Sequence, residues 1–321
     1  MTSSARGTPS TRAVLSGDRR ALARAISAVE NGAPEADGIL RSIYPRTGRA
    51  PIVGFTGPLG VGKSSVISAL VGLLRERGRK VGVIAVDPSS PFSGGSVLGD
   101  RIRFERSADD DGVFFRSMAS RGAVGGVAAT TREVARLLEA AGYDLILVET
   151  VGSGQVDIAI RDIASTRVVV LVPHLGDEVQ TLKAGLFEIA DVFCVNKADL
   201  PGAEVAQRDL AELVSLGPQR AGFRIPIVRT STFQPSGLEE LWAAIESHEK
   251  YLDESGSRLD GERQRLSKEI VGQVRDRVGA ELSTRLERDP SLRHLLDEVV
   301  ARRLDPRSAA DRLYKTRNRR R

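Results

Sequence analysis

The chain of 321 residues contains a single cysteine, Cys194, which lies in the apolar run DVFCVN. One cysteine excludes an intramolecular disulfide and a cysteine metal cluster, and it fits a reducing compartment. The longest apolar runs, such as VVVLVP at 168–173, fall far short of the roughly 20 residues that span a bilayer. The first 20 residues also lack an apolar signal core. These absences predict a soluble cytoplasmic protein with no membrane partner.

A net positive charge is confined to one segment of the chain. Residues 301–321 carry nine Lys or Arg against two Asp, a local charge of +7. Since the whole chain carries +5, the remainder carries −2 (5 minus 7). Basic residues do not interleave with aromatic ones, which make up only 4% of the chain. We therefore predict no nucleic-acid partner and expect the basic tail to be a solvated, partly disordered end.

The pattern of apolar residues divides the chain into four parts. Residues 1–14 are rich in Ser, Thr, Gly and Arg, and are predicted to be disordered. Residues 15–49 form a helical arm, with Ser16 near the helix start and Gly32 at its end as cap signals. Residues 251–321 form a helical extension, and residues 50–250 between them form the main domain. One face of the arm helix is apolar and consists of Leu22, Ala25, Ile26 and Val29.

Short apolar runs alternate with amphipathic segments between residues 50 and 250. Such an alternation predicts an α/β domain with a doubly wound, mostly parallel sheet and helices on both faces. The expected strands are 51–57, 80–87, 112–118, 144–150, 167–173, 191–196 and 225–231. The expected helices include 63–77, 127–141, 177–190, 203–216 and 237–250.

The helical extension carries an apolar stripe that the chain cannot bury within a single helix. A second helix begins with Asp289 as N-cap and Pro290 at its first position. These helices could fold back on the main domain or pair with a second copy of the chain, and of the two we predict a homodimer. The stripe repeats every four residues, at Leu266, Ile270, Val274, Val278, Leu282 and Leu286.

The segment GPLGVGKS, residues 57–64, matches G-x-x-x-x-G-K-[ST] between a predicted strand and a predicted helix. In this context backbone N–H groups wrap phosphates, Lys63 reaches the β- and γ-phosphates, and Ser64 ligates Mg²⁺. A glycine-rich turn that merely starts a helix is the alternative, but the order of strand, motif and helix favours a nucleotide site. The predicted contacts are Gly57, Gly60, Val61, Gly62, Lys63, Ser64 and Ser65.

The segment NKAD, residues 196–199, ends another apolar strand. It could be an ordinary turn, but downstream of a P-loop it favours guanine. Asp199 can accept from both N1–H and N2–H₂ of guanine, which adenine cannot offer. Asn196 would steady the loop and the Lys197 stem would lie along the base. RTST at 229–232 would add N–H groups near the guanine O6, from Ser231 and Thr232.

Four acids follow strands or loops or begin a helix: Asp87, Asp100, Glu149 and Asp177. Each could be a cap or turn residue. Strand ends of an open α/β sheet converge on the ligand crevice, however, and carboxylates beside phosphates require a cation. In VETVGSGQ, residues 148–155, the Gly152 N–H is placed to meet a γ-phosphate. Gln155 is offset by two residues from the water-positioning glutamine of small GTPases, so we interpret it as a switch residue of the catalytic loop.

Several segments resemble the MeaB/ArgK family, which includes MMAA. They are DRRALARAISAVENG, GFTGPLGVGKSS, AVDPSSPFSGGSVLGDRIR, ATTREVARLLEAAGYDLILVETVGSGQ, GDEVQTLKAGLFEIADVFCVNKAD and the helical C-terminus. The similarity covers roughly residues 15 to 305. The segments DPSS…GG…LGD and VETVG.GQ are its most specific parts, because ordinary small GTPases lack them.

The resemblance implies a SIMIBI-class P-loop GTPase that converts GTP to GDP and phosphate. It also implies a homodimeric chaperone that gates adenosylcobalamin loading and protects or reactivates an acyl-CoA mutase, chiefly methylmalonyl-CoA mutase. No cobalamin site is assigned on this chain. Asp87, Asp100 and Glu149 would be the Mg²⁺-linked switch acids. A further switch at 176–183, with Asp177, Gln180 and Lys183, would touch the mutase.

The sequence departs from the family pattern where partner specificity is expected. GSGQ stands in place of GVGQ, Thr181 in place of Gly and Ala184 in place of Lys, and His174 is unusual. The partner could therefore be a relative such as a branched-chain or 2-hydroxyacyl-CoA mutase. Two alternatives remain: a P-loop kinase of small molecules, and a nickel-insertion GTPase of the same class. The second normally needs His or Cys clusters, whereas this chain has only His174, His248 and His294 and one cysteine.

Overall fold

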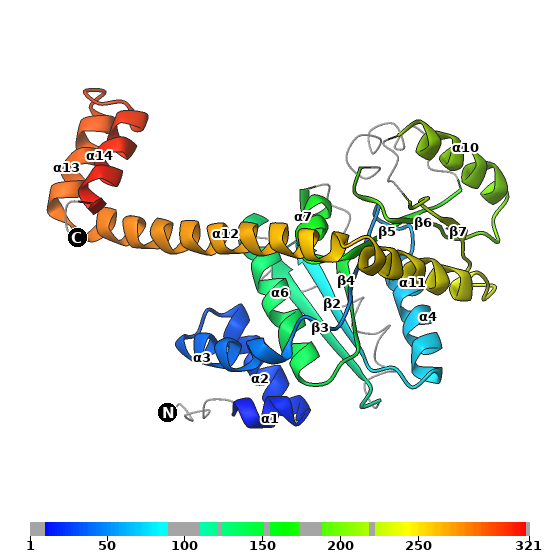
Figure 1. The fold of residues 1–321 in the computed structure, drawn as a ribbon. Coiled ribbons are helices and arrows are strands. Elements are labelled where there is room, and N and C mark those ends of the chain that lie inside the picture. Colours follow the sequence, from blue (N-terminus) through cyan, green and yellow to red (C-terminus); the bar gives the residue numbers. More distant parts are fainter. Residues whose placement is uncertain are drawn as a thin grey trace. The chain divides into compact units, whose positions relative to one another are not determined.

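The computed structural model describes residues 10–88, 110–120, 124–150, 155–173, 188–217 and 222–318. The chain divides into two units, Met1–Leu266 and Ser267–Arg321. The first unit contains the sheet and its flanking helices (Figure 1).

Seven parallel strands form one sheet in the order β3-β2-β4-β1-β5-β6-β7. Four strands rich in buried Val, Ile and Leu lie side by side at its centre, namely β2, β4, β1 and β5. This is expected for a sheet covered on both faces. The predicted doubly wound parallel sheet is confirmed. The strands are β1 (Ile52–Thr56), β2 (Val81–Pro88), β3 (Val113–Ser120), β4 (Leu145–Thr150), β5 (Thr166–Leu171), β6 (Val192–Val195) and β7 (Ile227–Arg229).

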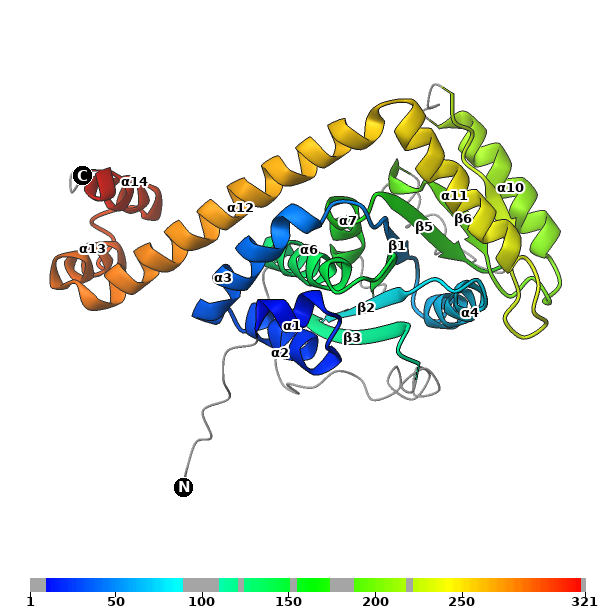
Figure 2. The same ribbon diagram turned by 60° about the horizontal axis from the view of Figure 1, so that its bottom comes forward.

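Helices cover both faces of the sheet and divide the core into two apolar clusters (Figure 2). On one face α4 (Lys63–Glu76) and α11 (Leu238–Glu254) bury Leu70 and Trp242 against β1 and β5. On the other face lie α6 (Val124–Ala140), α7 (Gln155–Ile163) and α10 (Ala203–Leu216). Helix α7 was not expected from the sequence. The expected helix at 177–190 lies outside the described residues except for its last positions.

The N-terminal arm packs on α6 and shares its apolar cluster. It comprises α1 (Thr11–Leu15), α2 (Arg19–Glu30), α3 (Pro34–Ile43) and the 3₁₀ turn Tyr44–Arg46. Helix α1 overlaps residues expected to be disordered. Asp18, not Ser16, caps α2, because its side chain accepts from the Ala21 N–H at 2.7 Å. On the connection to β1, the N–H groups of residues 48–50 all donate to Glu139 of α6.

The C-terminal helices are α12 (Ser257–Arg288), α13 (Pro290–Val300) and α14 (Pro306–Asn318). The expectation of a partly disordered basic tail is wrong for residues 306–318, which form a helix. Its first turn is capped by Asp305, whose Oδ1 accepts from the N–H groups of Arg307 and Ser308 at 3.0 Å each. No helix in the described part of the chain is long and apolar enough to cross a membrane.

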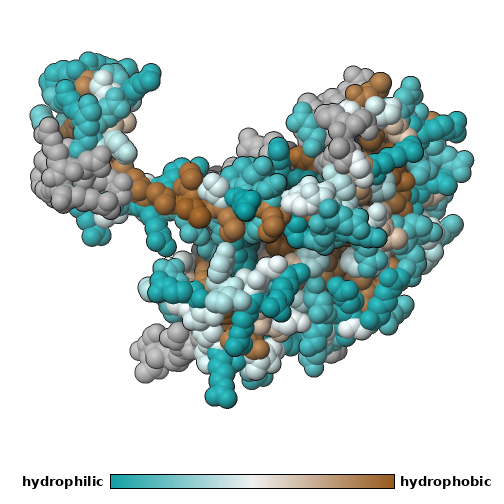
Figure 3. All heavy atoms as spheres, in the orientation of Figure 1, coloured by the Kyte–Doolittle hydropathy of each residue, from teal (hydrophilic) through white to brown (hydrophobic). Residues whose placement is uncertain are grey.

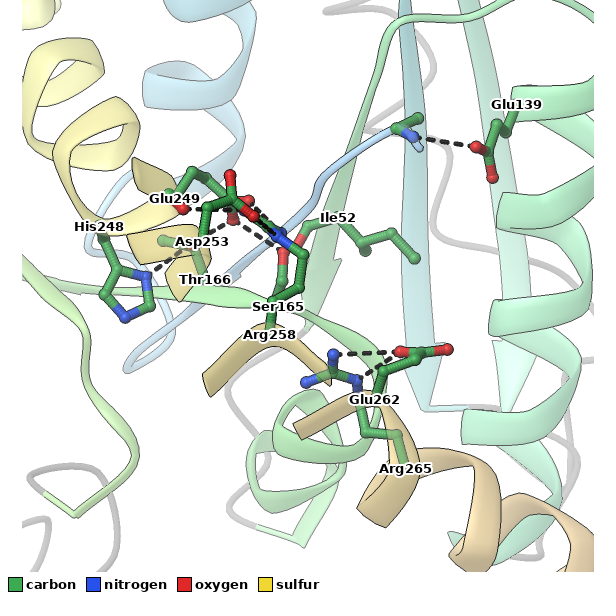
Figure 4. Close-up of polar contacts among 11 residues, drawn as sticks. Ile52, Glu139, Ser165, Thr166, His248, Glu249, Asp253, Arg258, Glu262 and Arg265 are labelled. Atoms are coloured by element: carbon green, nitrogen blue, oxygen red, sulfur yellow. Dashed lines mark hydrogen bonds and ion pairs between the residues drawn. The ribbon is translucent and has the colours of Figure 1, made fainter. Parts of the chain in front are cut away.

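A polar network at the amino ends of the strands fixes the end of α11 and the first turn of α12 (Figure 4). Glu249 accepts from Ser165 at 2.8 Å and from Thr166, and its other oxygen accepts from Arg258 at 2.7 Å. His248 Nδ1 lies 2.7 Å from Thr166 Oγ1. The carboxyl ends of the strands, where ligands bind in sheets of this kind, lie at the other end of the sheet. This network therefore does not occupy the region where a ligand is expected.

Asp191 belongs to the same edge of the sheet and is completely buried. It accepts from the backbone N–H of Arg167 at 2.8 Å and from its guanidinium at 2.6 and 2.8 Å. We expect Asp191→Ala to lower the free energy of unfolding by about 3–5 kcal/mol, because it leaves the Arg167 guanidinium, whose side chain is only 16% exposed, without its carboxylate. Urea denaturation measures this loss. Glu204→Ala, which breaks the exposed pair with Arg229, is the matched control and should cost at most about 1 kcal/mol.

Candidate nucleotide site

The P-loop connects β1 to α4 and contains three glycines whose backbone angles or close neighbours disfavour a side chain. Gly60 and Gly62 have φ angles of 80° and 93°, in the left-handed region. A Cβ on Gly57 would lie 2.2 Å from the Val170 carbonyl oxygen, and one on Gly62 would lie 2.5 Å from Asn196 Nδ2. The loop is therefore packed against β5 on one side and against the NKAD segment on the other.

Lys63 and Ser64 begin α4 and are both buried. Lys63 Nζ donates to the carbonyl oxygens of Gly57 at 2.8 Å and Pro58 at 2.9 Å, so the ammonium group lies inside the loop. The Lys63 ammonium group and the N-terminus of α4 thus lie at the same place. Both carry positive charge or partial charge, and this arrangement binds phosphates.

Glu149 comes from β4, the strand between β1 and β2, and only 5% of it is exposed. The register pairs it with Phe55 of β1 and Ala85 of β2. Ser64 Oγ donates to Glu149 Oε1 at 2.6 Å, which joins the P-loop to the end of β4. A hydroxyl beside a carboxylate offers the hard oxygen ligands that Mg²⁺ prefers, so these two residues fit the ion that accompanies a nucleoside triphosphate.

The NKAD segment follows β6 and is hydrogen-bonded to the P-loop. Asn196 Nδ2 donates to the Val61 carbonyl oxygen at 2.9 Å, and Lys197 Nζ donates to the Gly60 carbonyl oxygen at 3.0 Å. Lys197 has a φ of 57°, an uncommon left-handed conformation for a lysine. The segment thus orders itself against the loop expected to hold the phosphates.

The loop after β7 is hydrogen-bonded to the NKAD segment. Ser231 Oγ donates to Asp199 Oδ1, and Ser231 and Ser236 exchange two backbone hydrogen bonds of 3.1 Å each. Thr230, fully buried, donates to Asn196 Oδ1 at 3.2 Å. The sequence signal RTST indicated this loop, but Thr230 was not among the predicted site residues. The hydrogen bond from Thr230 holds the side-chain amide of Asn196 in place.

The described residues include only part of the predicted site. The backbone places Asp87 near the carboxyl end of β2 beside Ala119 of β3, and Gln155 at the start of α7. The side chains of these two residues are not described. The remaining predicted residues lie outside the described part of the chain: Asp100, Gly152, Asp177, Gln180 and Lys183.

A P-loop between the first strand and helix of a parallel sheet, with NKAD after β6, defines a P-loop GTPase. Residues 22–287 match the family described as methylmalonyl Co-A mutase-associated GTPase MeaB. The chain belongs to this family.

Relatives in other organisms match nearly the whole chain. A protein of Pyrococcus horikoshii is 46% identical over 302 residues, which cover 92% of this chain and 93% of that protein. GTPase ArgK of Escherichia coli is 34% identical over 313 residues, which cover 95% and 94%. The crystal structure of a protein named LAO/AO transport system kinase superposes with a TM-score of 0.71 at 26% identity, covering 96% of each chain. The chain therefore has the fold and the length of these proteins.

Proposed function

We propose that this GTPase serves as a Mg²⁺-dependent chaperone of an adenosylcobalamin-dependent acyl-CoA mutase. The observation that carries the proposal is the match of residues 22–287 to a family described by its association with methylmalonyl-CoA mutase. The chaperone would use GTP hydrolysis to time the loading of the cofactor into the mutase and to protect or reactivate it. Methylmalonyl-CoA mutase itself, or a branched-chain or 2-hydroxyacyl-CoA relative, is the proposed partner.

The proposed hydrolysis is an in-line attack of water on the γ-phosphate, in which the protein supplies placement and charge. Lys63 would donate to the β- and γ-phosphate oxygens, since its ammonium group already lies among the carbonyl groups of the loop. Ser64, Asp87, Asp100 and Glu149 would hold Mg²⁺ directly or through water, and the ion would offset the developing negative charge. The Gly152 N–H would donate to the γ-phosphate. Gln155 would act as a switch residue that changes position when this phosphate leaves.

The proposed guanine contacts occupy the other end of the site. Asp199 would accept from N1–H and N2–H₂, while Asn196 and Lys197 hold the loop against Gly60 and Val61. The backbone N–H groups of Ser231 and Thr232 would approach O6. Asp177, Gln180 and Lys183 would form the switch that contacts the mutase.

We also propose that two copies of the chain associate through the C-terminal helices. In the second unit Ile270, Val271 and Val274 are 61%, 64% and 57% exposed on α12. Figure 3 shows apolar side chains along this helix. A stripe of this kind is typical of helices that bury it against another chain.

The test of the chaperone proposal measures GTP turnover with and without the candidate mutase. We expect the cognate mutase to raise the rate several-fold, since a partner can complete the site for the transition state, an effect that reaches about 10³-fold or more in other GTPases. We also expect a non-hydrolysable GTP analogue and GDP to give different affinities in a pull-down. An unrelated CoA-dependent enzyme is the control. A tightly bound mutase that leaves the rate unchanged would contradict the proposal.

A further inference from the structure

Phe233 is the most exposed large apolar side chain in the described part of the chain, at 84%. It lies in the loop after β7, two residues beyond Ser231, and its neighbours Thr232 and Gln234 are polar. A single exposed apolar residue is common on protein surfaces. This one belongs to the loop whose Ser231 donates to Asp199, the carboxylate proposed to read guanine.

The loop that carries Phe233 is fixed at several points. The two hydrogen bonds between Ser231 and Ser236 close it, and Ser231 Oγ also accepts from the Gln234 N–H at 3.0 Å. Pro235 restricts the backbone before the closing residue. Behind it, Gly237 has a φ of 74°, and a Cβ there would lie 1.8 Å from the Arg229 carbonyl oxygen. A loop closed so tightly holds the aromatic ring out into solvent at a defined place.

Asp199 and Ser231 fix where a guanine edge would lie relative to this ring. Ser231 Oγ donates to Asp199 Oδ1, so the start of this loop contacts the carboxylate that is proposed to read guanine. Because two residues of extended chain span at most about 7 Å, the Cα of Phe233 lies no farther than that from the Cα of Ser231. Lys197, whose Nζ donates to the Gly60 carbonyl oxygen, comes from the loop after β6, the strand next to β7. The two loops can therefore supply one cover for each face of a base.

We propose that Phe233 stacks on the guanine ring and sets the affinity of the site for the nucleotide, opposite the stem of Lys197. This inference rests on the proposed assignment of Asp199 as the guanine-reading residue. An aromatic ring over a base binds through the π-face that every base has. Phe233 thus strengthens binding without selecting guanine, whereas Asp199 selects it.

The experiment measures equilibrium dissociation constants of GTP, GDP and ITP for Phe233→Ala, Phe233→Leu and Phe233→Tyr. We expect Phe233→Ala to weaken all three nucleotides by a similar factor of about 10, within the range measured for loss of a base–aromatic stack. Phe233→Leu should fall between wild type and alanine, and Phe233→Tyr should bind like wild type. Tyr314→Ala, an exposed aromatic of α14, is the matched control.

The outcomes separate this inference from the assignment on which it rests. Asp199→Asn tests the assignment through its preference for XTP over GTP, and Phe233→Ala in that background should weaken XTP by the same factor. If Asp199→Asn changes the preference but Phe233→Ala leaves every dissociation constant unchanged, the stacking inference is wrong and the assignment stands. The same unchanged constants together with weaker mutase binding would assign Phe233 to protein docking instead. If Asp199→Asn does not change the preference, both are overturned.

Discussion

Lys63→Ala is expected to lower the rate of GTP hydrolysis by about 10²–10³-fold, the usual cost of removing one preorganised donor from a charged transition state. Lys63 is 5% exposed and its Nζ donates to two carbonyl oxygens of the P-loop, so the substitution removes a positive charge from inside the loop. Phosphate release at saturating GTP measures the loss. Binding of the triphosphate should weaken as well, since the ammonium group is proposed to contact the β- and γ-phosphates.

Two variants make the Lys63 result interpretable. Lys250→Ala removes an exposed lysine of α11 that pairs with Glu254, and it should hydrolyse GTP like wild type. Lys63→Arg keeps the charge but enlarges a side chain held inside the loop, and it should not restore activity. Thermal unfolding of each variant establishes that the fold is intact. Normal turnover by a folded Lys63→Ala protein would refute the assignment of the P-loop as the catalytic site.

Asp199→Asn is expected to reverse the nucleotide preference from GTP to XTP. In the proposed contact the carboxylate would accept two hydrogen bonds from guanine, whereas an asparagine would set its NH₂ group against the guanine N2–H₂. Xanthine carries an oxygen at this position, which the same NH₂ group can donate to. Since a hydrogen bond to a charged group contributes about 1.5–3 kcal/mol, GTP affinity should fall by at least about ten-fold. Competition of GTP, XTP and ATP against a fluorescent nucleotide measures the change.

The matched control for this variant is Asp209→Asn, which replaces an exposed aspartate of α10. It should leave the order of nucleotide affinities unchanged. The wild-type protein should prefer GTP to ATP, because adenine offers neither of the donors that Asp199 reads. A wild-type preference for ATP would instead favour the small-molecule kinase that the P-loop alone allows.

Periodicity predicted the sheet well because its central strands are short, continuous apolar runs. The limits of β4 and of α10 came out within one residue of the prediction. The seventh strand was predicted too long, since Pro226 has no N–H for a ladder and residues 230–231 turn into the loop. Helix α7 was missed because Val156, Ile158 and Ile160 alternate as they would in a strand.

The motifs predicted which residues form the site, but not how they meet. The contact between Ser64 and Glu149 depends on the register of β1 and β4, and the sequence carries no direct signal for register. The role of Thr230 depends likewise on the distance between two strands. Helix α14, by contrast, had a readable signal. Asp305 and Pro306 repeat the arrangement of Asp289 and Pro290, from which we did predict a helix start.

The hydrogen bond from Asn196 to the Val61 carbonyl oxygen has a consequence for the energetics of binding. Together with the Thr230 contact to Asn196, it orders the phosphate loop and the base loop using protein atoms alone. The conformational entropy of these loops is therefore lost during folding and not during nucleotide binding. The favourable free energy of the contacts that the nucleotide makes at this end of the site is then reduced little by the cost of ordering these loops. The two loops are also in contact, since a Cβ on Gly62 would lie 2.5 Å from Asn196 Nδ2. A substitution at Gly62 would therefore disturb the loop proposed to read guanine and the phosphate loop at once.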